Sequence, residues 1–249
     1  MVEDERTPVL RVLARDVARR ALVVGDPKRV LDAAKYLNNV KELGFYREYR
    51  TVTGEYQGQR ITISSHGVGG SGANVCFHEL FRCGVQYVIR AGTCGAMQKG
   101  IRDGDVIIGA AAIREDGASE HLAPMSYPAV ADRRICEALV DACQTFGITS
   151  PHEGLVLTQG YFYPGILTSE VEFWLKTGLP ACVEMEIATL LVMASLNGVK
   201  AGGIFTSDGN MTEESDPETY DPHRTIVEEG KQKMLQIALH ALAIIPEQE

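Results

Sequence analysis

The chain has 249 residues, and its 24 Lys and Arg against 33 Asp and Glu give a formal net charge of −9. This acidic balance argues against nucleic acid as a partner, because proteins that neutralise many phosphates carry a basic surplus. Neither a signal peptide nor a run near the ~18 apolar residues of a membrane helix is visible. The hydrophobic fraction of 45% is that of an ordinary globular protein. We therefore expect one cytoplasmic domain over residues 1–249 that binds neither nucleic acid nor a membrane.

The first half of the chain alternates strand, turn and helix signals. Apolar residues at 21–25 predict a strand, and Asp26-Pro27 then begins a predicted helix. Two alternating runs on either side of Gln57-Gly58 predict a β-hairpin. A glycine loop at 67–72 follows, and it opens a predicted helix that ends at Gly84.

The second half repeats this alternation. Strands are expected within 85–95, 105–116, 153–160, 181–186 and 200–209, and helices around 131–146, 186–197 and 224–243. Strands that alternate with helices predict an α/β fold: a single domain with a mixed, largely parallel central β-sheet flanked by helices. The segment 210–223 is rich in acids and proline, and it is either a connecting loop or a mobile lid over a site.

The six cysteines form no Cys-x-x-Cys pair and stand in segments with the character of a hydrophobic core. Reduced, buried thiols explain that pattern better than a disulfide framework or a zinc site. The histidines, including His66 and His121, show no metal-ligand spacing such as H-x-x-x-H. The sequence therefore predicts no metal site. The cysteines are Cys76, Cys83, Cys94, Cys136, Cys143 and Cys182.

The glycine loop matches the G-x-G-x-x-G pattern of dinucleotide-binding proteins between a predicted strand and a predicted helix. Such proteins need an acidic residue at the end of the next strand to bind the ribose, and Arg90 stands there instead. NAD binding is therefore disfavoured, and an NADP-dependent oxidoreductase is the last of the alternatives. The loop still offers glycine backbone and free N–H groups to a small ligand.

Three arginines stand beside glycines and strand ends: Arg29, Arg47 and Arg90. An arginine side chain presents fixed donors that match phosphate oxygens, and Thr93 adds a hydroxyl close to Arg90. Ligands of open α/β sheets gather at the carboxyl ends of the strands. Together these residues predict a site for inorganic phosphate.

Six motifs give the chain a resemblance to a known family: GDPKRV at 25–30, REYRTVTGEYQGQ at 47–59, SHGVGGSG at 65–72, VIRAGTCGA at 88–96, VEMEIATL at 183–190 and SDG at 207–209. Through these motifs the chain resembles the hexameric nucleoside phosphorylases, the family of purine nucleoside phosphorylases and uridine phosphorylases. The resemblance implies the nucleoside phosphorylase fold and reversible phosphorolysis of a nucleoside to a free base and ribose 1-phosphate. It implies inorganic phosphate as co-substrate and no metal or organic cofactor.

The resemblance also implies the residues of the site. Those that would bind phosphate are Gly25, Arg29, Arg90 and Thr93, with Arg47 donated by the neighbouring subunit. Those that would bind ribose are Met185 and Glu186, and those that would bind the base are Phe162 and Glu184. A site completed by a neighbour implies a homo-oligomer, and the family resemblance implies a homohexamer built as three dimers.

Asp208 is the candidate catalytic residue. It follows the apolar run GGIFTS, where burial would raise the pKa of a carboxyl group towards neutrality, as a general acid requires. A departing purine needs a proton or hydrogen bond at N7, and Asp208 would supply it. The plainer interpretation of this residue is a turn or helix-capping aspartate.

The same positions favour a purine over a pyrimidine. Uridine phosphorylases resemble the chain at 114–132 but bind uracil through a glutamine and an arginine after the aromatic residue, and 161–174 contains neither. Bacterial members bind the 5′-hydroxyl with a histidine where this chain has Val9, so recognition of the 5′-end stays open. Bacterial members also pair the acid with an arginine at the position of Asp221, and the protozoan-like branch lacks that arginine too. We expect inosine and guanosine as the preferred nucleosides.

Three alternatives stay open beside purine nucleoside phosphorolysis. A uridine phosphorylase would use the same phosphate chemistry on a pyrimidine. A nucleosidase on the same fold would use water, and it would have no use for Arg29, Arg47 and Arg90 together. A non-catalytic nucleoside-binding protein would keep the pocket without the acid function of Asp208.

Overall fold

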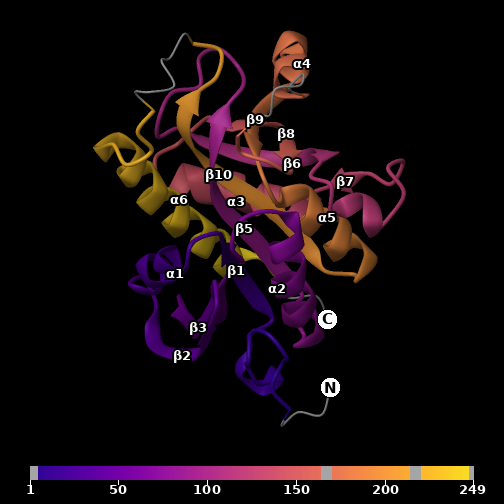
Figure 1. Ribbon diagram of the computed structural model, residues 1–249. Coiled ribbons are helices and arrows are strands. Elements are labelled where there is room, and N and C mark those ends of the chain that lie inside the picture. The colour runs from indigo at the N-terminus through magenta and orange to yellow at the C-terminus, as the bar shows by residue number, and fades with distance from the viewer. Residues whose placement is uncertain (1–4, 164–169, 214–219, 247–249) are drawn as a thin grey trace.

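A ten-stranded mixed sheet forms the centre of the computed structural model, which describes residues 5–163, 170–213 and 220–246 (Figure 1). The strand order is β10-β6-β8-β9-β5-β1-β4-β3-β2, with β7 paired to β6. The strands are β1 Arg20–Val24, β2 Asn38–Tyr46, β3 Tyr49–Tyr56, β4 Gln59–Ser65, β5 Tyr87–Ala96, β6 Val106–Glu115, β7 Ala129–Val130, β8 His152–Gln159, β9 Pro180–Glu184 and β10 Lys200–Asn210. The helices are η1 Ala14–Asp16, α1 Pro27–Ala34, α2 Gly70–Arg82, η2 Ser119–His121, α3 Arg133–Thr145, α4 Glu170–Thr177, α5 Ile187–Leu196 and α6 Thr225–Ile244.

Part of the sheet closes on itself. Strand β10 pairs in parallel with β5 on one side and antiparallel with β6 on the other. Since β6 continues through β8 and β9 back to β5, these five strands form a ring. A strand held by two neighbours has no free edge, and its residues keep a fixed register against both.

The predicted mixed α/β fold is confirmed, but the expectation of a largely parallel sheet is too strong. Among the described residues, five strand pairs are parallel and five are antiparallel. The antiparallel pairs are β2–β3 and β3–β4 in the meander, β10–β6 and β5–β9 in the ring, and β6–β7. The predicted hairpin is the β3–β4 pair, where Gln57 and Gly58 both have positive φ, as a type I′ turn requires.

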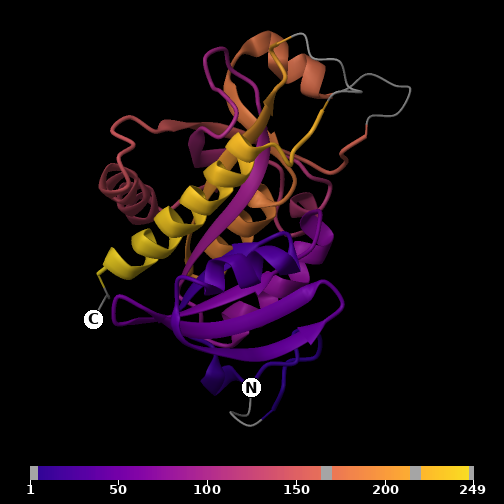
Figure 2. The same cartoon turned by 90° about the vertical axis from the view of Figure 1, so that its left-hand side faces the viewer.

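Helices cover both faces of the sheet (Figures 1 and 2). Helices α1, α3 and α6 share one buried apolar cluster, and α2 and α5 share the other. The side chains of Asp26 and Asp132 cap α1 and α3 by accepting backbone N–H bonds. The helices expected at 131–146, 186–197 and 224–243 are confirmed as α3, α5 and α6.

Helix α5 differs from the others because it is apolar on all sides. Every residue from Ile187 to Ala194 is buried. A helix that is hydrophobic all round belongs in the interior, where neighbours cover each face. Its N-terminus is therefore fixed deep in the molecule, directly after the strand that carries Glu184.

All six cysteines are free thiols, four of them buried and Cys83 and Cys136 half-buried. Burial raises the pKa of Cys76 to about 12, which keeps that sulfur protonated and unreactive at neutral pH. Within the described part of the chain, every helix is too short or too polar to cross a bilayer.

Candidate active site

Arg90 lies in the central strand β5 and is only 4% exposed. Its Nε and Nη2 donate to Glu184 Oε2 at 3.0 and 2.9 Å, and Nη2 also donates to Glu186. Two carboxylates therefore hold one guanidinium, which is the arrangement that makes a buried charge tolerable. Its third nitrogen, Nη1, is buried and has no hydrogen-bond partner among the described residues. That nitrogen is an unused donor in the centre of the molecule.

Glu184 joins the arginine to the start of helix α5. Its carboxylate accepts hydrogen bonds from the backbone N–H groups of Glu186 and Ile187, at 2.8 to 3.1 Å. The hydroxyl of Thr158, at the end of β8, donates to Glu184 Oε1 at 2.8 Å. Both oxygens of Glu184 are thus engaged by donors of the protein itself, and they in turn fix the orientation of Arg90.

The glycine loop contacts this cluster through its backbone. The N–H of Gly69 donates to Glu186 Oε1 at 2.5 Å, so the loop binds a carboxylate of its own chain. Gly67 and Gly69 have φ values of 75° and 87°, a conformation that glycine adopts without strain. A Cβ on Gly70 would lie 2.5 Å from the hydroxyl oxygen of Thr189, so the close packing of α2 on α5 needs glycine there.

Gly92 makes room for the arginine. A Cβ on Gly92 would lie 2.4 Å from Nη1 of Arg90, so the guanidinium lies directly over this backbone. The fixed carboxylates on the other side leave it no alternative position. The glycine in the motif RAGTCG therefore has a steric cause that the sequence alone does not reveal.

Arg29 and Gly25 lie near the same place, at the end of β1. Burial lowers the pKa of Arg29 and the positive charge of Arg90 lowers it further, whereas Asp208 is among the acids that raise it. These effects require Arg29 to lie within electrostatic range of both Arg90 and Asp208. Gly25 is hydrogen-bonded to Gly67, which joins the end of β1 to the glycine loop.

Asp208 occupies a β-bulge in β10. Ser207 pairs with Cys94 and Gly209 pairs with Gly95, so Asp208 has no partner of its own in β5. Bulges bend a strand locally and re-aim a side chain, and they are common beside active sites. The bulge therefore provides a local reason why this acid departs from the regular alternation of the strand.

Asp208 is 8% exposed, and burial raises the pKa of its carboxyl group. Hydrogen bonds with the hydroxyls of Tyr220 and Thr93 lower that pKa, and so does the charge of Lys231, but these effects do not outweigh burial. Arg224 donates to the backbone carbonyl of Asp208 at 3.1 Å and leaves the carboxyl group itself unpaired with a guanidinium. A carboxyl group in this environment is suited to hold a proton.

The aromatic side chains of Phe162, Tyr163 and Tyr220 form a group that reaches Asp208 through Tyr220. Phe162 is 61% exposed, and its ring centre lies 6.5 Å from that of Tyr220. Tyr163 packs edge-on against Phe162, with 5.0 Å between the ring centres. Met185 is half-buried in the short connection between Glu184 and Glu186. Through Tyr220, Phe162 and Asp208 belong to one contiguous group.

Arg47 stands apart from the buried arginines. It lies in the turn between β2 and β3, has a φ of 54°, and is exposed. Its guanidinium lies over the ring of Tyr46, at 5.6 Å from the ring centre. Within this single chain the structure does not bring Arg47 together with Arg29 and Arg90.

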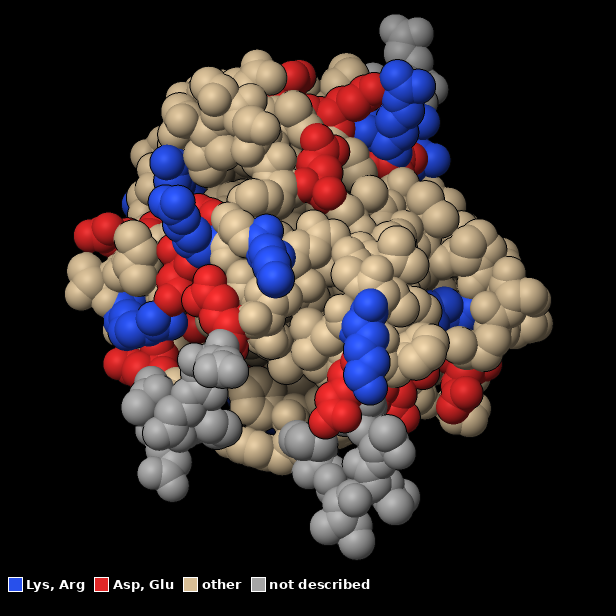
Figure 3. Space-filling model, turned by 90° about the horizontal axis from the view of Figure 1, so that it is seen from above, with Lys and Arg blue, Asp and Glu red and all other residues tan. Residues whose placement is uncertain are grey.

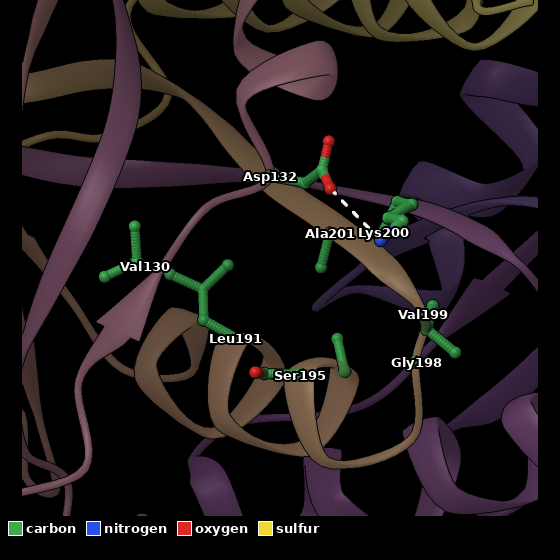
Figure 4. A pocket seen from close by; sticks show the side chains of 9 residues that line it. Val130, Asp132, Leu191, Ser195, Gly198, Val199, Lys200 and Ala201 are labelled. Atoms are coloured by element: carbon green, nitrogen blue, oxygen red, sulfur yellow. Dashed lines mark ion pairs between the residues drawn. The ribbon is translucent and has the colours of Figure 1, made fainter.

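A surface pocket of about 150 Å³ lies far from this group, between the end of α5 and the start of β10 (Figure 4). Its only charged pair, Lys200 and Asp132, is bridged at 3.5 Å. Lys200 and Asp208 are eight residues apart on one strand, or roughly 26 Å. The pocket therefore does not belong to the candidate site. Its lining residues are Val130, Asp132, Leu191, Ala194, Ser195, Gly198, Val199, Lys200 and Ala201.

The end of the molecule that carries α4 has no continuous basic patch in view (Figure 3). Lysines and arginines alternate there with aspartates and glutamates among neutral residues. A large basic face would be needed to bind a nucleic-acid backbone. The arginines of the candidate site lie elsewhere: Arg90 is buried and Arg29 is half-buried.

Sequence reasoning missed three residues of this group: Thr158, Gly92 and Tyr220. Thr158 and Gly92 stand in apolar strand motifs, where only the folded register shows what they contact. Tyr220 falls in the segment 210–223, for which a connecting loop and a lid were the two interpretations. Residues 214–219 of that segment lie outside the described residues, so neither interpretation is tested.

Comparisons with known proteins agree with this geometry. The model of the phosphorylase superfamily matches residues 19–243. A purine nucleoside phosphorylase of Plasmodium vivax is 40% identical over 190 residues, 76% of this chain and 77% of that protein. A uridine phosphorylase of Escherichia coli is 33% identical over 243 residues, 92% of this chain and 90% of that protein.

A solved structure extends the likeness to the whole fold. The purine nucleoside phosphorylase of Toxoplasma gondii, crystallised with immucillin-H, superposes with a TM-score of 0.91 at 35% identity, over 98% of this chain and 97% of that one. The buried arginine held by two glutamates, the glycine loop and the bulged acid thus stand in a fold shared with known nucleoside-cleaving enzymes. With the match over residues 19–243, they show that the chain belongs to the phosphorylase superfamily.

Proposed function

We propose that this protein catalyses reversible phosphorolysis of purine ribonucleosides, with inosine and guanosine preferred, to a free purine and ribose 1-phosphate. The observation that carries the proposal is that β5 carries an unused buried donor, Nη1 of Arg90, and the neighbouring strand β10 carries the buried acid Asp208, with Arg29 in electrostatic range of both residues. One is an unused donor for an anion, and the other is a carboxyl group whose pKa is raised. Phosphorolysis needs both functions close together.

The proposed chemistry follows from these positions. Arg90, Arg29, Thr93 and the backbone at Gly25 bind inorganic phosphate, and one phosphate oxygen attacks C1′ of the ribose as the bond from C1′ to the base nitrogen breaks. Glu186 and Met185 orient the sugar while positive charge develops on it. Asp208 donates its proton to N7 of the leaving purine, and Phe162 stacks on the base. Inorganic phosphate is a co-substrate, and we propose that no metal or organic cofactor takes part.

Glu184 receives a revised role in this proposal. The sequence suggested contact with the base, but both carboxylate oxygens are engaged by Arg90, Thr158 and backbone N–H groups. We propose that Glu184 holds Arg90 in place instead. The exposure of Arg47 supports its action in a neighbouring subunit, and with it the proposed homohexamer of three dimers. The cytoplasm is the proposed compartment.

Uridine is the second candidate substrate, because the uridine phosphorylase of Escherichia coli matches 92% of the chain, against 76% for the purine enzyme of Plasmodium vivax. The carboxyl group of Asp208 favours a purine, since it can protonate a leaving base at N7. A single set of reactions separates the candidates. Inosine, guanosine and uridine are each incubated with the protein, with and without phosphate, and the sugar product is identified.

We expect ribose 1-phosphate from inosine and guanosine, only when phosphate is present. Free ribose formed at the same rate without phosphate would show a nucleosidase instead. Faster turnover of uridine than of either purine nucleoside would move the assignment to a uridine phosphorylase. Tight nucleoside binding without turnover would show a non-catalytic binding protein.

A further inference from the structure

Tyr220 is held in place by the turn that follows it. Lys231, on helix α6, donates to the carbonyl oxygen of Pro222 at 2.9 Å. Arg224 donates to the carbonyl oxygen of Asp208 at 3.1 Å and pairs with Asp103. Two basic side chains thus fasten this turn to α6 and to β10.

The ring of Tyr220 lies against the strand immediately after the acid. A Cβ on Gly209 would lie 3.5 Å from the ring, an ordinary van der Waals contact, so the ring packs against the strand at Gly209. The ring also contacts Phe162, at an interplanar angle of 44°. Tyr220 therefore touches both the strand that carries the acid and the aromatic residue proposed to stack on the base.

The hydroxyl group of Tyr220 hydrogen-bonds the carboxyl group of Asp208. The interaction affects the pKa of both groups. It lowers the pKa of Asp208 and contributes to the raised pKa of Tyr220, for which burial is the larger cause. A phenol with a raised pKa stays protonated and remains a donor across the range in which a carboxyl group titrates.

We propose that Tyr220 is a positioning residue, whose hydroxyl orients the carboxyl group of Asp208 and whose ring fixes the distance between that acid and the Phe162 platform. This rests on the proposed function, in which Asp208 protonates a base stacked on Phe162. The acid and the platform come from strand ends far apart in the sequence, and Tyr220 contacts both of them. Tyr220 acts through these two residues and is not itself assigned a proton transfer.

Other titratable and charged groups also lie near Asp208, and they influence the pH dependence of any reaction that uses it. Lys231 faces it from α6 and Arg29 from α1, both with positive charge. Cys94 lies on β5, and the negative charge of Asp208 helps to raise the pKa of that thiol. The variants below leave all of these groups unchanged.

The test compares Tyr220→Phe with the wild type in the phosphorolysis of inosine from pH 5 to pH 10. Loss of the hydroxyl removes a hydrogen bond that favours the ionised acid, so the pKa of Asp208 rises. The fall of kcat at high pH should then move to a higher pH. On the low-pH plateau of each profile, where kcat no longer changes with pH, poorer orientation should lower kcat about 3–10-fold. KM for inosine should stay within about twofold, because the ring remains.

Tyr220→Leu separates the ring from the hydroxyl. It should show the same movement of the high-pH limb, and KM for inosine should rise about 2–10-fold, because an aromatic contact with Phe162 is lost. The matched control is Tyr163→Phe, since Tyr163 also packs on Phe162 and is 83% exposed. Its pH profile should superimpose on that of the wild type.

The outcomes distinguish the two proposals. A wild-type protein that does not cleave inosine with phosphate contradicts the proposed function, whatever the variants do. An active wild type whose pH profile and kcat superimpose on those of Tyr220→Phe would overturn the positioning role alone. An equal shift in Tyr163→Phe would also overturn it, because the effect would then belong to the aromatic group in general.

Discussion

The anion side and the base side of the candidate site are built in opposite ways. On the anion side, Arg90 is almost fully buried and fixed by two carboxylates, a helix start and the glycine loop. On the base side, Phe162 and Tyr220 are exposed, and their rings contact each other. A buried cluster of fixed charges suits one unchanging partner, whereas an open aromatic group can accept bases of different shape.

This difference explains why similar proteins can differ in substrate. Proteins named as purine and as uridine phosphorylases both match the chain over most of its length. The phosphate and ribose are common to both reactions, and the buried ring of strands would serve both equally. Under the proposed function, the identity of the base would then depend on the few residues around Phe162 and Asp208.

The sharpest test of the base side is Asp208→Ala. The variant should lose about 10²–10⁴-fold in kcat with inosine, the usual range for general acid catalysis. In the wild type, activity should fall as pH rises through the raised pKa of Asp208, because the acid must be protonated. Steady-state kinetics across pH measure both effects. The control is Asp141→Ala, at an exposed position on α3. A wild-type kcat in Asp208→Ala would remove Asp208 from the mechanism.

The anion side is tested by Arg90→Ala, which should lower kcat/KM about 10²–10³-fold. It should also lower the free energy of unfolding by about 3–5 kcal/mol, since Glu184 and Glu186 would stay buried without their counter-charge. Kinetics and thermal unfolding measure the two losses. Arg133→Ala removes an exposed ion pair with Glu137 and should change stability by less than about 0.5 kcal/mol. An unchanged Tm in Arg90→Ala would show that the cluster is not the fixed element described above.

A finer test of the same side is Gly92→Ala. The new methyl group would displace Nη1 of Arg90, which the two glutamates prevent from moving away freely. KM for phosphate should rise about tenfold, the equivalent of one charge-assisted hydrogen bond. The dissociation constant for nucleoside alone, measured by calorimetry, should change little. Equal losses for phosphate and nucleoside would indicate a general distortion of β5.

The smallest effect is expected for Thr158→Val, which keeps the shape but removes the hydroxyl that donates to Glu184. The loss in unfolding free energy should be about 1–2 kcal/mol, because the hydroxyl also accepts the N–H of Ala188. Chemical denaturation measures it. Thr145→Val, at the exposed end of α3, should cost less than about 0.5 kcal/mol. A neutral Thr158→Val would mean that Arg90 and the backbone N–H groups at the start of α5 fix Glu184 without the hydroxyl.

Much of the fold could be predicted because its signals are local. The hairpin at Gln57-Gly58 and the helix that begins after Asp132 follow from turn and capping chemistry. The closure of β10 onto both β5 and β6 could not be predicted, since strand pairing depends on residues far apart in the sequence. Strand β2 lacked the alternation of a half-buried strand, because it is exposed along most of its length.

The features of the candidate site also fall into those with a local sequence signal and those without one. Arg29, Arg90 and Asp208 could be proposed from residue type and from their place beside glycines and strand ends. The pairing of Arg90 with Glu184 and Glu186 could not be predicted, because Arg90 is nearly a hundred residues away from either glutamate in the sequence. Contacts made only after folding, such as that of Tyr220 with Asp208, leave no spacing pattern in the sequence.

The bulge in β10 has a last consequence. Ser207 and Gly209, on either side of Asp208, each have a partner in β5, so the ladder of hydrogen bonds is complete without the residue between them. The proposed acid is therefore an extra residue that the pairing of β10 with β5 does not use. A chain shortened by Asp208 alone would carry a regular strand and should fold with a Tm close to that of the full chain, while losing its chemistry. Architecture and reactivity are thus separable at a single position of the backbone.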